Sequence, residues 1–443
     1  MNKKIVSLVL LLAVITTTIT LILQRQDEGQ STQMPGLGSQ GTISSSEFLN
    51  AEKAVEHYRE LIRKHPDDVN NYVQLAQLYL QQGRLTGNNA EYLPKAAALL
   101  DAALEHSAET SEIVITKATI AATLHHFREA KELASKAIAM NPHTAFYYGL
   151  LCDANVELGN YDEAVRACDK MVSIRPDLRS YSRVSYLREL HGDIDGAIHA
   201  MTMAAEAGVT GQENRAWVLY NLGMLFLNQN KVDSAEYIFK GILQERNGYA
   251  HALRGLAKVQ GMKGRYKESI EYYKQAIAAL NEPAFHEGLG EVYQYLGNFS
   301  EMRTCYDNAE ELYHEEQEMG ENNSLEMAEF FASHNRNVEE ALTLAQKAIM
   351  ERKSVHGYYV LALALFKNGK HDEAWTSIQQ AMKLGTKDAS MLYLAGAIAD
   401  KVGNAEQSKH FLTRALTVNP NFSFLYAADA KQILEKHKTF GSL

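Results

Sequence analysis

The chain has 443 residues, a formal net charge of −10 from 44 Lys+Arg and 54 Asp+Glu, and a composition that is 46% apolar and 22% charged. This composition argues against an intrinsically disordered chain, and the acidic balance argues against a protein that coats nucleic acid, because that function needs dense Lys and Arg. Only 7 Pro beside 28 Gly favours helices over a fold rich in strands and turns.

The N-terminal residues predict a membrane segment. The basic start MNKK is followed by an uncharged apolar run, residues 5–23, whose length as a helix is close to the thickness of a bilayer core. The run ends without a small-residue cleavage site, so we expect residues 1–23 to be an uncleaved signal anchor. A removed signal peptide and a buried helix of a soluble fold are the alternatives.

The charges around this run predict the location of the rest of the chain. Because the basic end prefers the cytoplasm, we expect the bulk of the chain on the extracytoplasmic side of the membrane, which is the periplasm in a Gram-negative cell. Cleavage of the segment would give a secreted or periplasmic protein instead. Residues 24–46 are rich in Gln, Ser, Gly and Thr without periodicity, which indicates a flexible linker.

From Glu47 onward the sequence repeats itself with a period of about 34 residues. Each unit predicts a helix, a turn centred on Gly, and a second helix with a small residue near its start. The turn reads GNYDEA at 159–164, GRYKES at 264–269 and GKHDEA at 369–374. Gly can end the first helix in a left-handed conformation, and the acidic residue favours the N-terminus of the next helix.

This pattern resembles the tetratricopeptide repeat superfamily over residues 47–422. The resemblance implies an all-α, right-handed superhelical solenoid of about ten to eleven helix-turn-helix repeats, whose first helices line a concave groove. We expect the first unit to be a second helix only, an insertion around Gly87 and Asn88 to separate two helices, and acidic residues 315–321 to form a longer joint. Residues 423–443 should form a capping helix (424–436) and a tail.

No sequence motif indicates catalysis. The chain lacks an HExxH zinc motif, a CxxC pair, a GxxxxGK[ST] phosphate loop and a GxSxG nucleophile turn. We therefore predict that the protein is not an enzyme and needs no cofactor or metal. Cys152 and Cys168 fall in the two helices of one repeat, where we expect small packing residues; a disulfide is the alternative if the chain is exported.

Candidate partner-binding residues are the first-helix positions that we expect to face the groove. Aromatic and Arg side chains are frequent anchors in interfaces. The principal candidates are Phe146, Tyr186, Trp217, Tyr220, Arg254, Lys258, Glu287, Glu291 and Tyr359, with Asp153, Glu157, Arg179, Tyr295, His356 and Tyr393 as further groove positions.

Within this set, Trp217 and Tyr220 precede a repeat that offers Arg254 and Lys258 one helical turn apart. We predict that this aromatic-plus-basic patch docks an acidic or C-terminal-carboxylate segment of a partner. A groove of ordinary mixed polarity is the alternative. The carboxylate-gripping subtype of the superfamily uses a Lys and Asn set that this sequence does not match, because the following repeat presents Glu287 and Glu291.

The sequence as a whole predicts a membrane-tethered, non-enzymatic scaffold that binds partner proteins or peptides in the concave groove and does not bind nucleic acid. A module of the cell envelope that senses or captures a small ligand or short peptide is the alternative. An enzyme of unfamiliar design is the third class, which a cleft with His and carboxylate side chains of strongly shifted pKa would indicate.

Overall fold

The computed structural model describes residues 45–440, and it describes side-chain surroundings for residues 52–437. The described chain forms 22 helices and no strand. None of these helices is both long and apolar enough to span a bilayer. The predicted anchor, residues 1–23, and all but the last two residues of the predicted linker 24–46 lie outside the described residues.

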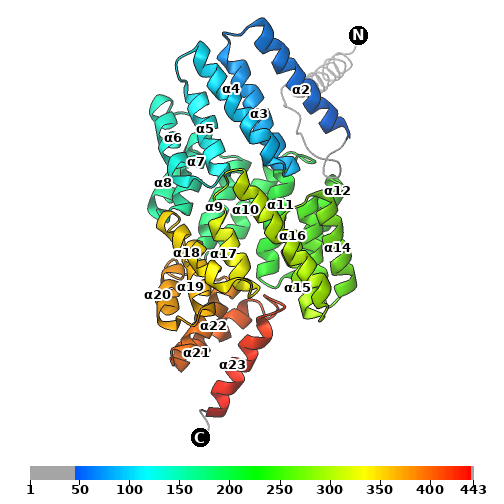
Figure 1. Cartoon of the computed structure of the whole chain (residues 1–443), viewed down its shortest axis with the longest axis vertical. Coiled ribbons are helices and arrows are strands. Elements are labelled where there is room, and N and C mark those ends of the chain that lie inside the picture. The colour runs from blue at the N-terminus through cyan, green and yellow to red at the C-terminus, as the bar shows by residue number, and fades with distance from the viewer. Residues whose placement is uncertain (1–44, 441–443) are drawn as a thin grey trace, which may run out of the picture.

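Twenty of the helices form ten antiparallel pairs that follow one another along the chain (Figure 1). The first helices of the pairs are α3 (Val69–Thr86), α5 (Ser111–Thr123), α7 (Ala145–Glu157), α9 (Leu178–Leu190), α11 (Glu213–Asn228), α13 (Ala250–Met262), α15 (Pro283–Tyr295), α17 (Ser324–Ser333), α19 (Val355–Lys367) and α21 (Ala389–Lys401). The second helices are α4 (Asn89–His106), α6 (Phe127–Met140), α8 (Tyr161–Ile174), α10 (Ile194–Glu206), α12 (Val232–Glu245), α14 (Tyr266–Ala279), α16 (Phe299–Glu318), α18 (Val338–Glu351), α20 (His371–Ala381) and α22 (Ala405–Val418).

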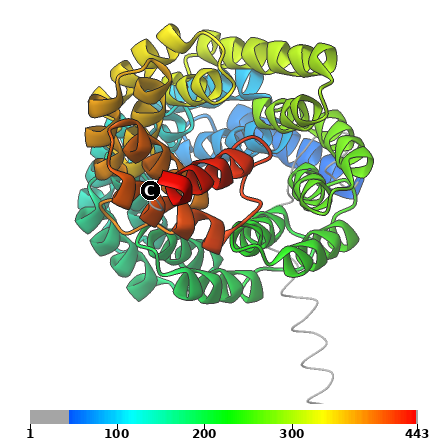
Figure 2. The same ribbon diagram turned by 90° about the horizontal axis from the view of Figure 1, so that it is seen from below.

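Two further helices stand at the ends of this array. Helix α2 (Ser45–Lys64) packs on α3 and holds the place of a lone second helix, and α23 (Ala427–Phe440) packs on α21 and α22. Seen from below in Figure 2, the pairs wind around a central axis, and the segment that leads into α23 crosses the middle of the ring. The described chain is therefore a superhelical solenoid of helix pairs.

The two kinds of helix bury different amounts of their surface. Second helices bury one narrow stripe: α18 buries Ala341, Ala345 and Ala348 at helical spacing, with Leu342 beside them. First helices are buried on several faces, as in α21, where every residue from Leu392 to Ala399 is buried. A first helix contacts its own partner and both neighbouring pairs, so stacking supplies the core that a single pair lacks.

The predicted Gly turns end the first helices as expected. Gly159 has φ +76°, and the next amide, Asn160 N, donates to Asn155 O at 2.8 Å, which closes the last turn of α7. His125 and Asn230 hold the same turn position without Gly and also have positive φ, at 59° and 56°. The local signature therefore forms the same turn even where its Gly is replaced.

Successive turns of the superhelix touch each other directly. Asn322 N donates to Leu124 O at 3.0 Å, and Val355 N donates to the hydroxyl of Tyr161 at 2.6 Å. In both cases the two partners belong to pairs that are six positions apart in the array. Six helix pairs thus complete one superhelical turn, and the solenoid is wound tightly enough for its turns to pack together.

One buried ion-pair cluster joins the two turns, and we call it the seam cluster. Arg352, which is 5% exposed, donates from Nη2 to Glu157 Oε2 at 2.9 Å and from Nη1 to Glu326 Oε1 at 2.8 Å. Its guanidinium also lies 5.0 Å from the ring centre of Phe127. Nearby, a Cβ on Gly159 would overlap the carbonyl of Lys353, so the backbones meet where only Gly fits.

Three sequence predictions about local structure were wrong. The residues around Gly87 and Asn88 do not form a long loop, because α3 and α4 are each lengthened to 18 residues and meet at a short turn. The acidic residues 315–321 are not an open joint, since α16 continues to Glu318. The last helix begins at Ala427 rather than at residue 424, and the preceding residues run through the superhelix as irregular chain.

Candidate functional site

The interior of the superhelix holds a cavity of about 310 Å³. One side of the cavity is made by first helices, from α11 through α13, α15, α17 and α19 to α21. The other side is made by the irregular segment before α23, residues 419–426, which we call the strap. The cavity therefore lies at the concave face that the repeat pattern predicts, and part of the chain itself closes it.

Predicted site residues occupy different places relative to this cavity. Lys258, Glu291 and Tyr359 line it, as does the further candidate Tyr393. Tyr220, Arg254 and Glu287 lie beside it, joined to the same helices by contacts described below. The remaining three principal candidates, Phe146, Tyr186 and Trp217, do not line it.

Lys258 is the main positive group at the cavity wall. Among the described residues it makes no ion pair, although Glu291 lines the same cavity. Burial lowers the pKa of Lys258, and Arg254 four residues earlier lowers it further, while Glu291 acts in the opposite direction. An anionic group entering the cavity would meet an ammonium that no carboxylate of the described residues contacts directly.

The carboxylates of α15 are already engaged. Glu291 Oε1 lies 3.5 Å from His334 Nε2, and Glu287 accepts a hydrogen bond from the hydroxyl of Tyr313 at 2.7 Å. Burial raises the pKa of Glu287. Burial alone would also raise the pKa of Glu291, but His334 and Lys258 hold it below the ordinary value, so this group remains an anion.

The aromatic-plus-basic patch is only partly open. Trp217 is 43% exposed, whereas Tyr220 is 5% exposed and accepts a hydrogen bond from Arg254 Nη1 at 2.8 Å. The Arg254 guanidinium lies 5.8 Å from the ring centre of Phe285. The His251 ring packs against both Trp217 and Tyr220, with centres 5.2 and 5.4 Å away. Tyr220 thus orients Arg254 rather than offering a free surface.

His251 is held neutral in this patch. Burial lowers its pKa to about 3, and the charges of Arg254 and Arg84 lower it in the same direction. The patch is therefore an apolar and aromatic surface around one fixed guanidinium, and a protonated His does not contribute to it at neutral pH.

The part of the lumen around α19 is polar and includes a sequence-predicted pair. The rings of His356 and Tyr359 stack with centres 6.0 Å apart, and His356 Nε2 lies 3.2 Å from Glu329 Oε2. Burial alone would lower the pKa of His356, but Glu329 raises it to about 9, so the imidazole is charged at neutral pH. Glu329 also lines the cavity.

Tyr186 lies near the meeting point of two superhelical turns. Tyr186 is 44% exposed. Protein atoms around its hydroxyl partly shield that group from water, which raises the pKa of Tyr186 above its ordinary value. Glu189, on the same helix, has a pKa raised to about 7 by burial and by Asp388 of α21. Asp388 itself caps α21 by accepting from Met391 N at 2.8 Å.

Three N-terminal candidates, Phe146, Asp153 and Arg179, serve the packing between α7 and α9. The Arg179 guanidinium lies 5.6 Å from the ring centre of Phe146, and Arg183 donates to Asp153 at 2.8 Å from Nε to Oδ1. Both contacts join adjacent repeats. The remaining candidate, Tyr295, packs its ring 5.9 Å from Phe424 of the strap.

Sequence reasoning missed Glu329 and the strap. Glu329 lies in a helix with few consensus residues, so nothing in its surroundings marked it as a groove position. The strap did carry a signal: after Pro420, the aromatic residues Phe422, Phe424 and Tyr426 alternate with other residues, which is not the spacing of a buried helical stripe.

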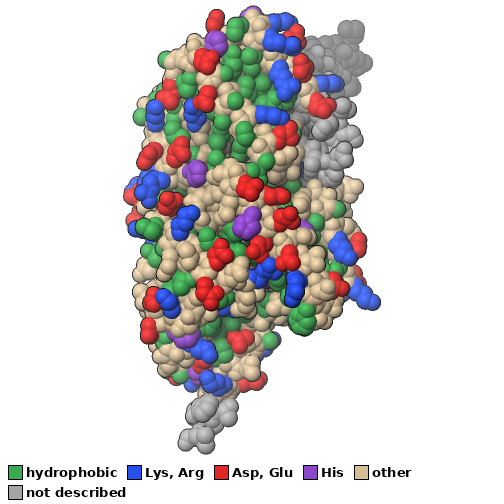
Figure 3. Space-filling view, viewed as in Figure 1, with side chains coloured by type: hydrophobic (Ala, Val, Ile, Leu, Met, Phe, Trp, Pro, Cys, Tyr) green, Lys and Arg blue, Asp and Glu red, His purple; other side chains and the backbone are tan. Residues whose placement is uncertain are grey.

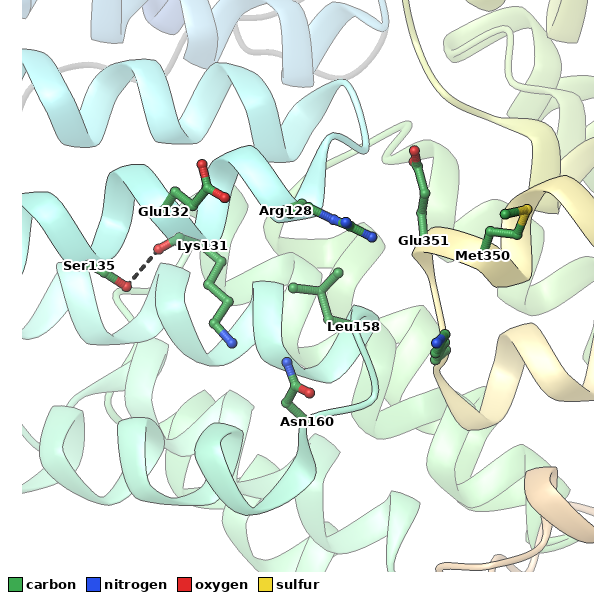
Figure 4. Close-up of a pocket in the computed structure, with 9 residues that line it drawn as sticks. Arg128, Lys131, Glu132, Ser135, Leu158, Asn160, Met350 and Glu351 are labelled. Carbon is green, nitrogen blue, oxygen red and sulfur yellow. Dashed lines mark hydrogen bonds between the residues drawn. The ribbon is translucent and has the colours of Figure 1, made fainter.

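The outer surface carries charges of both signs. On the face shown in Figure 3, acidic and basic side chains are interspersed over the middle of the molecule. A second, open furrow of about 590 Å³ lies outside, between α6, the turn before α8 and the end of α18 (Figure 4). Arg128, Lys131 and Lys353 line it together with Glu132 and Glu351.

The described residues offer no obvious centre for metal chemistry. Within residues 45–440, no three His, Cys, Asp or Glu side chains gather in a way that could hold a metal ion. Cys152 and Cys168 are both buried free thiols in the core between α7 and α8. They occupy the small packing positions that the repeat pattern indicates.

Comparison with protein families matches two parts of the chain to a tetratricopeptide repeat model, residues 115–178 and 220–282. Residues 334–415 match the model of subunit 3 of the anaphase-promoting complex, or cyclosome. A TPR repeat-containing protein of Methanocaldococcus jannaschii, MJ1428, is 20% identical over 345 residues, which are 65% of this chain and 60% of that protein. The match thus spans less than two thirds of this relative.

Solved structures with a similar helical arrangement share little sequence. The human IFIT1 dimer with PPP-AAAA is 14% identical, with a TM-score of 0.44 over 84% of this chain and 86% of that chain. PilW, a widely conserved type IV pilus biogenesis factor, is 15% identical, with a TM-score of 0.39 over 45% of this chain and 92% of that chain. At such low scores these likenesses carry no functional argument.

Proposed function

Because this chain belongs to the tetratricopeptide repeat superfamily, we propose that it is a non-enzymatic scaffold that binds a segment of a partner protein inside its superhelix. The observation that carries the proposal is the interior cavity, which first helices of six consecutive repeats line. Tight winding leaves room there for an extended segment or a chain terminus, not for a folded domain.

The chemistry of the cavity supports binding of a segment with an anionic group beside apolar side chains. Lys258 makes no direct ion pair within the described residues, and apolar surface on the same wall comes from Met224, Leu227, Met262 and Leu363. An unpaired cation in a confined, partly apolar site gains most when a ligand brings the opposite charge.

Charge reversal at Lys258 tests the proposal. In the full chain, Lys258→Glu should lower the amount of co-purified partner at least tenfold, because it places an anion next to Glu291. Lys274→Glu on α14 is the matched control, since Lys274 is exposed and the charge change is the same. Equal loss of partner in both variants, or loss in neither, would contradict a luminal site.

A small-ligand function is the second candidate. The cavity volume of about 310 Å³ is at the lower end of the range of small-molecule sites, which begins at roughly 300 Å³. Native mass spectrometry of the purified chain distinguishes the two functions. A bound mass of a few hundred daltons that disappears in Lys258→Glu favours the small ligand, and a bound peptide or protein favours the scaffold.

Membrane tethering is part of the proposal and rests on the sequence of residues 5–23 alone. The full chain should remain with the membrane fraction after alkaline carbonate extraction, whereas a chain that starts at Ser45 should be released. A protease added outside the cytoplasmic membrane should digest the repeats if they lie on the extracytoplasmic side. Release of the full chain by carbonate would contradict the proposed membrane tether.

A further inference from the structure

The strap occupies the place where a bound segment would lie. It leaves α22 on one side of the superhelix and reaches the opposite wall before α23 begins (Figure 2). At its start, Asn419 Nδ2 donates to Leu227 O of α11 at 3.2 Å. At its end, the hydroxyl of Tyr426 donates to Ser333 O of α17 at 2.6 Å. The strap thus bridges walls that are far apart in sequence.

The luminal wall accommodates aromatic rings of the strap in specific places. Phe424 packs against Gly261 of α13, where a Cβ atom would overlap the Phe424 ring, so the missing side chain forms a notch for the ring. The same ring contacts the rings of Tyr266 and Tyr295 at 6.3 and 5.9 Å between centres. Such aromatic contacts stabilise beyond the area that they bury.

The residues two positions before and after Phe424 share a second aromatic site on the wall. The rings of Phe422 and Tyr426 pack on Tyr393 of α21, with centres 5.6 and 5.2 Å away. The Lys367 ammonium lies 5.3 Å from the ring centre of Tyr426. The wall therefore holds three aromatic side chains at alternate positions of a segment that runs through consecutive turns.

The strap is held less firmly than the repeats. Its own backbone amides bond locally, as Asn421 N does to Asn419 Oδ1 at 2.9 Å and Leu425 N to Ser423 Oγ at 3.2 Å. Its bonds to the walls come from the two side chains at its ends. Its backbone also bonds to α22 and α23 at its two ends, through Asn419 N to Ala415 O and Ala430 N to Tyr426 O, both at 3.0 Å. A segment with few backbone bonds opens at lower free energy than a packed helix.

We propose that the strap is an intramolecular occupant of the partner site, and that the partner docks by an irregular segment with aromatic residues at alternate positions, which displaces the strap. This inference rests on the proposed function and adds the chemistry of the partner and its competitor. The partner segment places one ring in the Gly261 notch and another on Tyr393, and its acidic group pairs with Lys258.

A labelled peptide with the sequence of residues 417–428, TVNPNFSFLYAA, is the probe. In the wild-type full chain the tethered strap competes at an effective concentration of the order of millimolar, so the free peptide binds weakly. In the full-length variant Phe422→Ala with Phe424→Ala, fluorescence anisotropy should show at least tenfold tighter binding. The control is the same peptide with both Phe replaced by Ala, whose affinity should be no higher for the strap variant than for the wild type.

A wall variant shows where the peptide binds. Gly261→Leu fills the notch, so adding it to the strap variant should abolish the gain. If the strap variant retains its helical circular dichroism but binds the peptide no better than the Ala control, the proposal is overturned. If light scattering of the strap variant gives the mass of two chains, a second copy of the chain occupies the site. This result would contradict the proposal that a different protein is the partner.

A milder variant keeps the test decisive if the double Ala variant does not fold. Tyr426→Phe removes only the hydroxyl, with its bond to Ser333 O and the longer bond that it accepts from Lys367 Nζ at 3.4 Å. This loss should tighten peptide binding about two- to tenfold. No gain would contradict the proposal. If natural partner binding falls in Lys258→Glu yet is unchanged by release of the strap, the luminal site stands and only the displacement is wrong.

Discussion

Removal of Arg352 should loosen the contact between superhelical turns. Arg352 is buried and bridges Glu157 of α7 and Glu326 of α17, and these two carboxylates are 24% and 28% exposed. Arg352→Met keeps the length of the side chain but leaves two partly buried carboxylates without their cation. Breaking a buried pair costs about 3–5 kcal/mol, and partial exposure of the carboxylates reduces this to about 2–4 kcal/mol.

The effect should be local, because a repeat array can open between neighbours without unfolding throughout. Hydrogen exchange at two seam amides reports it: Asn322 N, bonded to Leu124 O, and Val355 N, bonded to Tyr161. A loss of about 2–4 kcal/mol corresponds to about 30- to 900-fold faster exchange when local opening governs the rate.

Two further variants control this experiment. Lys95→Met removes a surface pair with Glu91, which is worth less than about 1 kcal/mol, and should leave the seam amides unchanged. Adding Glu157→Gln to Arg352→Met should restore part of the protection, because one uncompensated charge is removed. Seam amides that exchange at wild-type rates in Arg352→Met would refute the view that the seam cluster holds the turns together.

Three other comparisons test the roles of close packing and burial. Gly159→Ala should destabilise more than Gly369→Ala, because both have positive φ but only Gly159 meets the backbone of the next turn; equal melting temperatures would contradict this. Phe239→Ala should cost about 3–5 kcal/mol in urea unfolding, whereas Tyr237→Ala, 81% exposed, should cost little. Burial and two neighbouring glutamates raise the pKa of Glu321 to about 8 from 4.5, so the folded state holds a proton that the unfolded state releases. Stability should therefore fall as pH rises from 4.5 through 8, by on the order of 1 kcal/mol or more, and Glu321→Gln should flatten this fall in thermal melts across that range.

The sequence predicts the repeat because each turn is a local structure. Gly159 ends a helix, and the small residues of the second helices allow close packing of the two helices in a pair. Both effects act between residues close in sequence, so the pattern can be recognised from the sequence alone. Similar reasoning found Lys258 and Glu291 at the concave face. Tyr220 was predicted as an open groove residue but is buried, because its hydroxyl reaches Arg254 of the next repeat.

Contacts between superhelical turns could not be predicted in the same way. Arg352 meets Glu157 across 195 residues only because small rotations of six successive pairs add up to one full turn. Residues 424–426 of the strap were predicted to begin the capping helix, which starts only at Ala427. Its path depends on the width of the lumen, which no local pattern encodes.

Cross-linking from inside and outside the superhelix shows whether a partner binds in the lumen. A photoreactive phenylalanine analogue at Tyr359, which lines the cavity, and one at Tyr237, on the outer face of α12, are compared in the full chain in its native cells. We expect a partner to cross-link through Tyr359 and none through Tyr237. A partner that cross-links at Tyr237 but never at Tyr359 would contradict binding in the lumen.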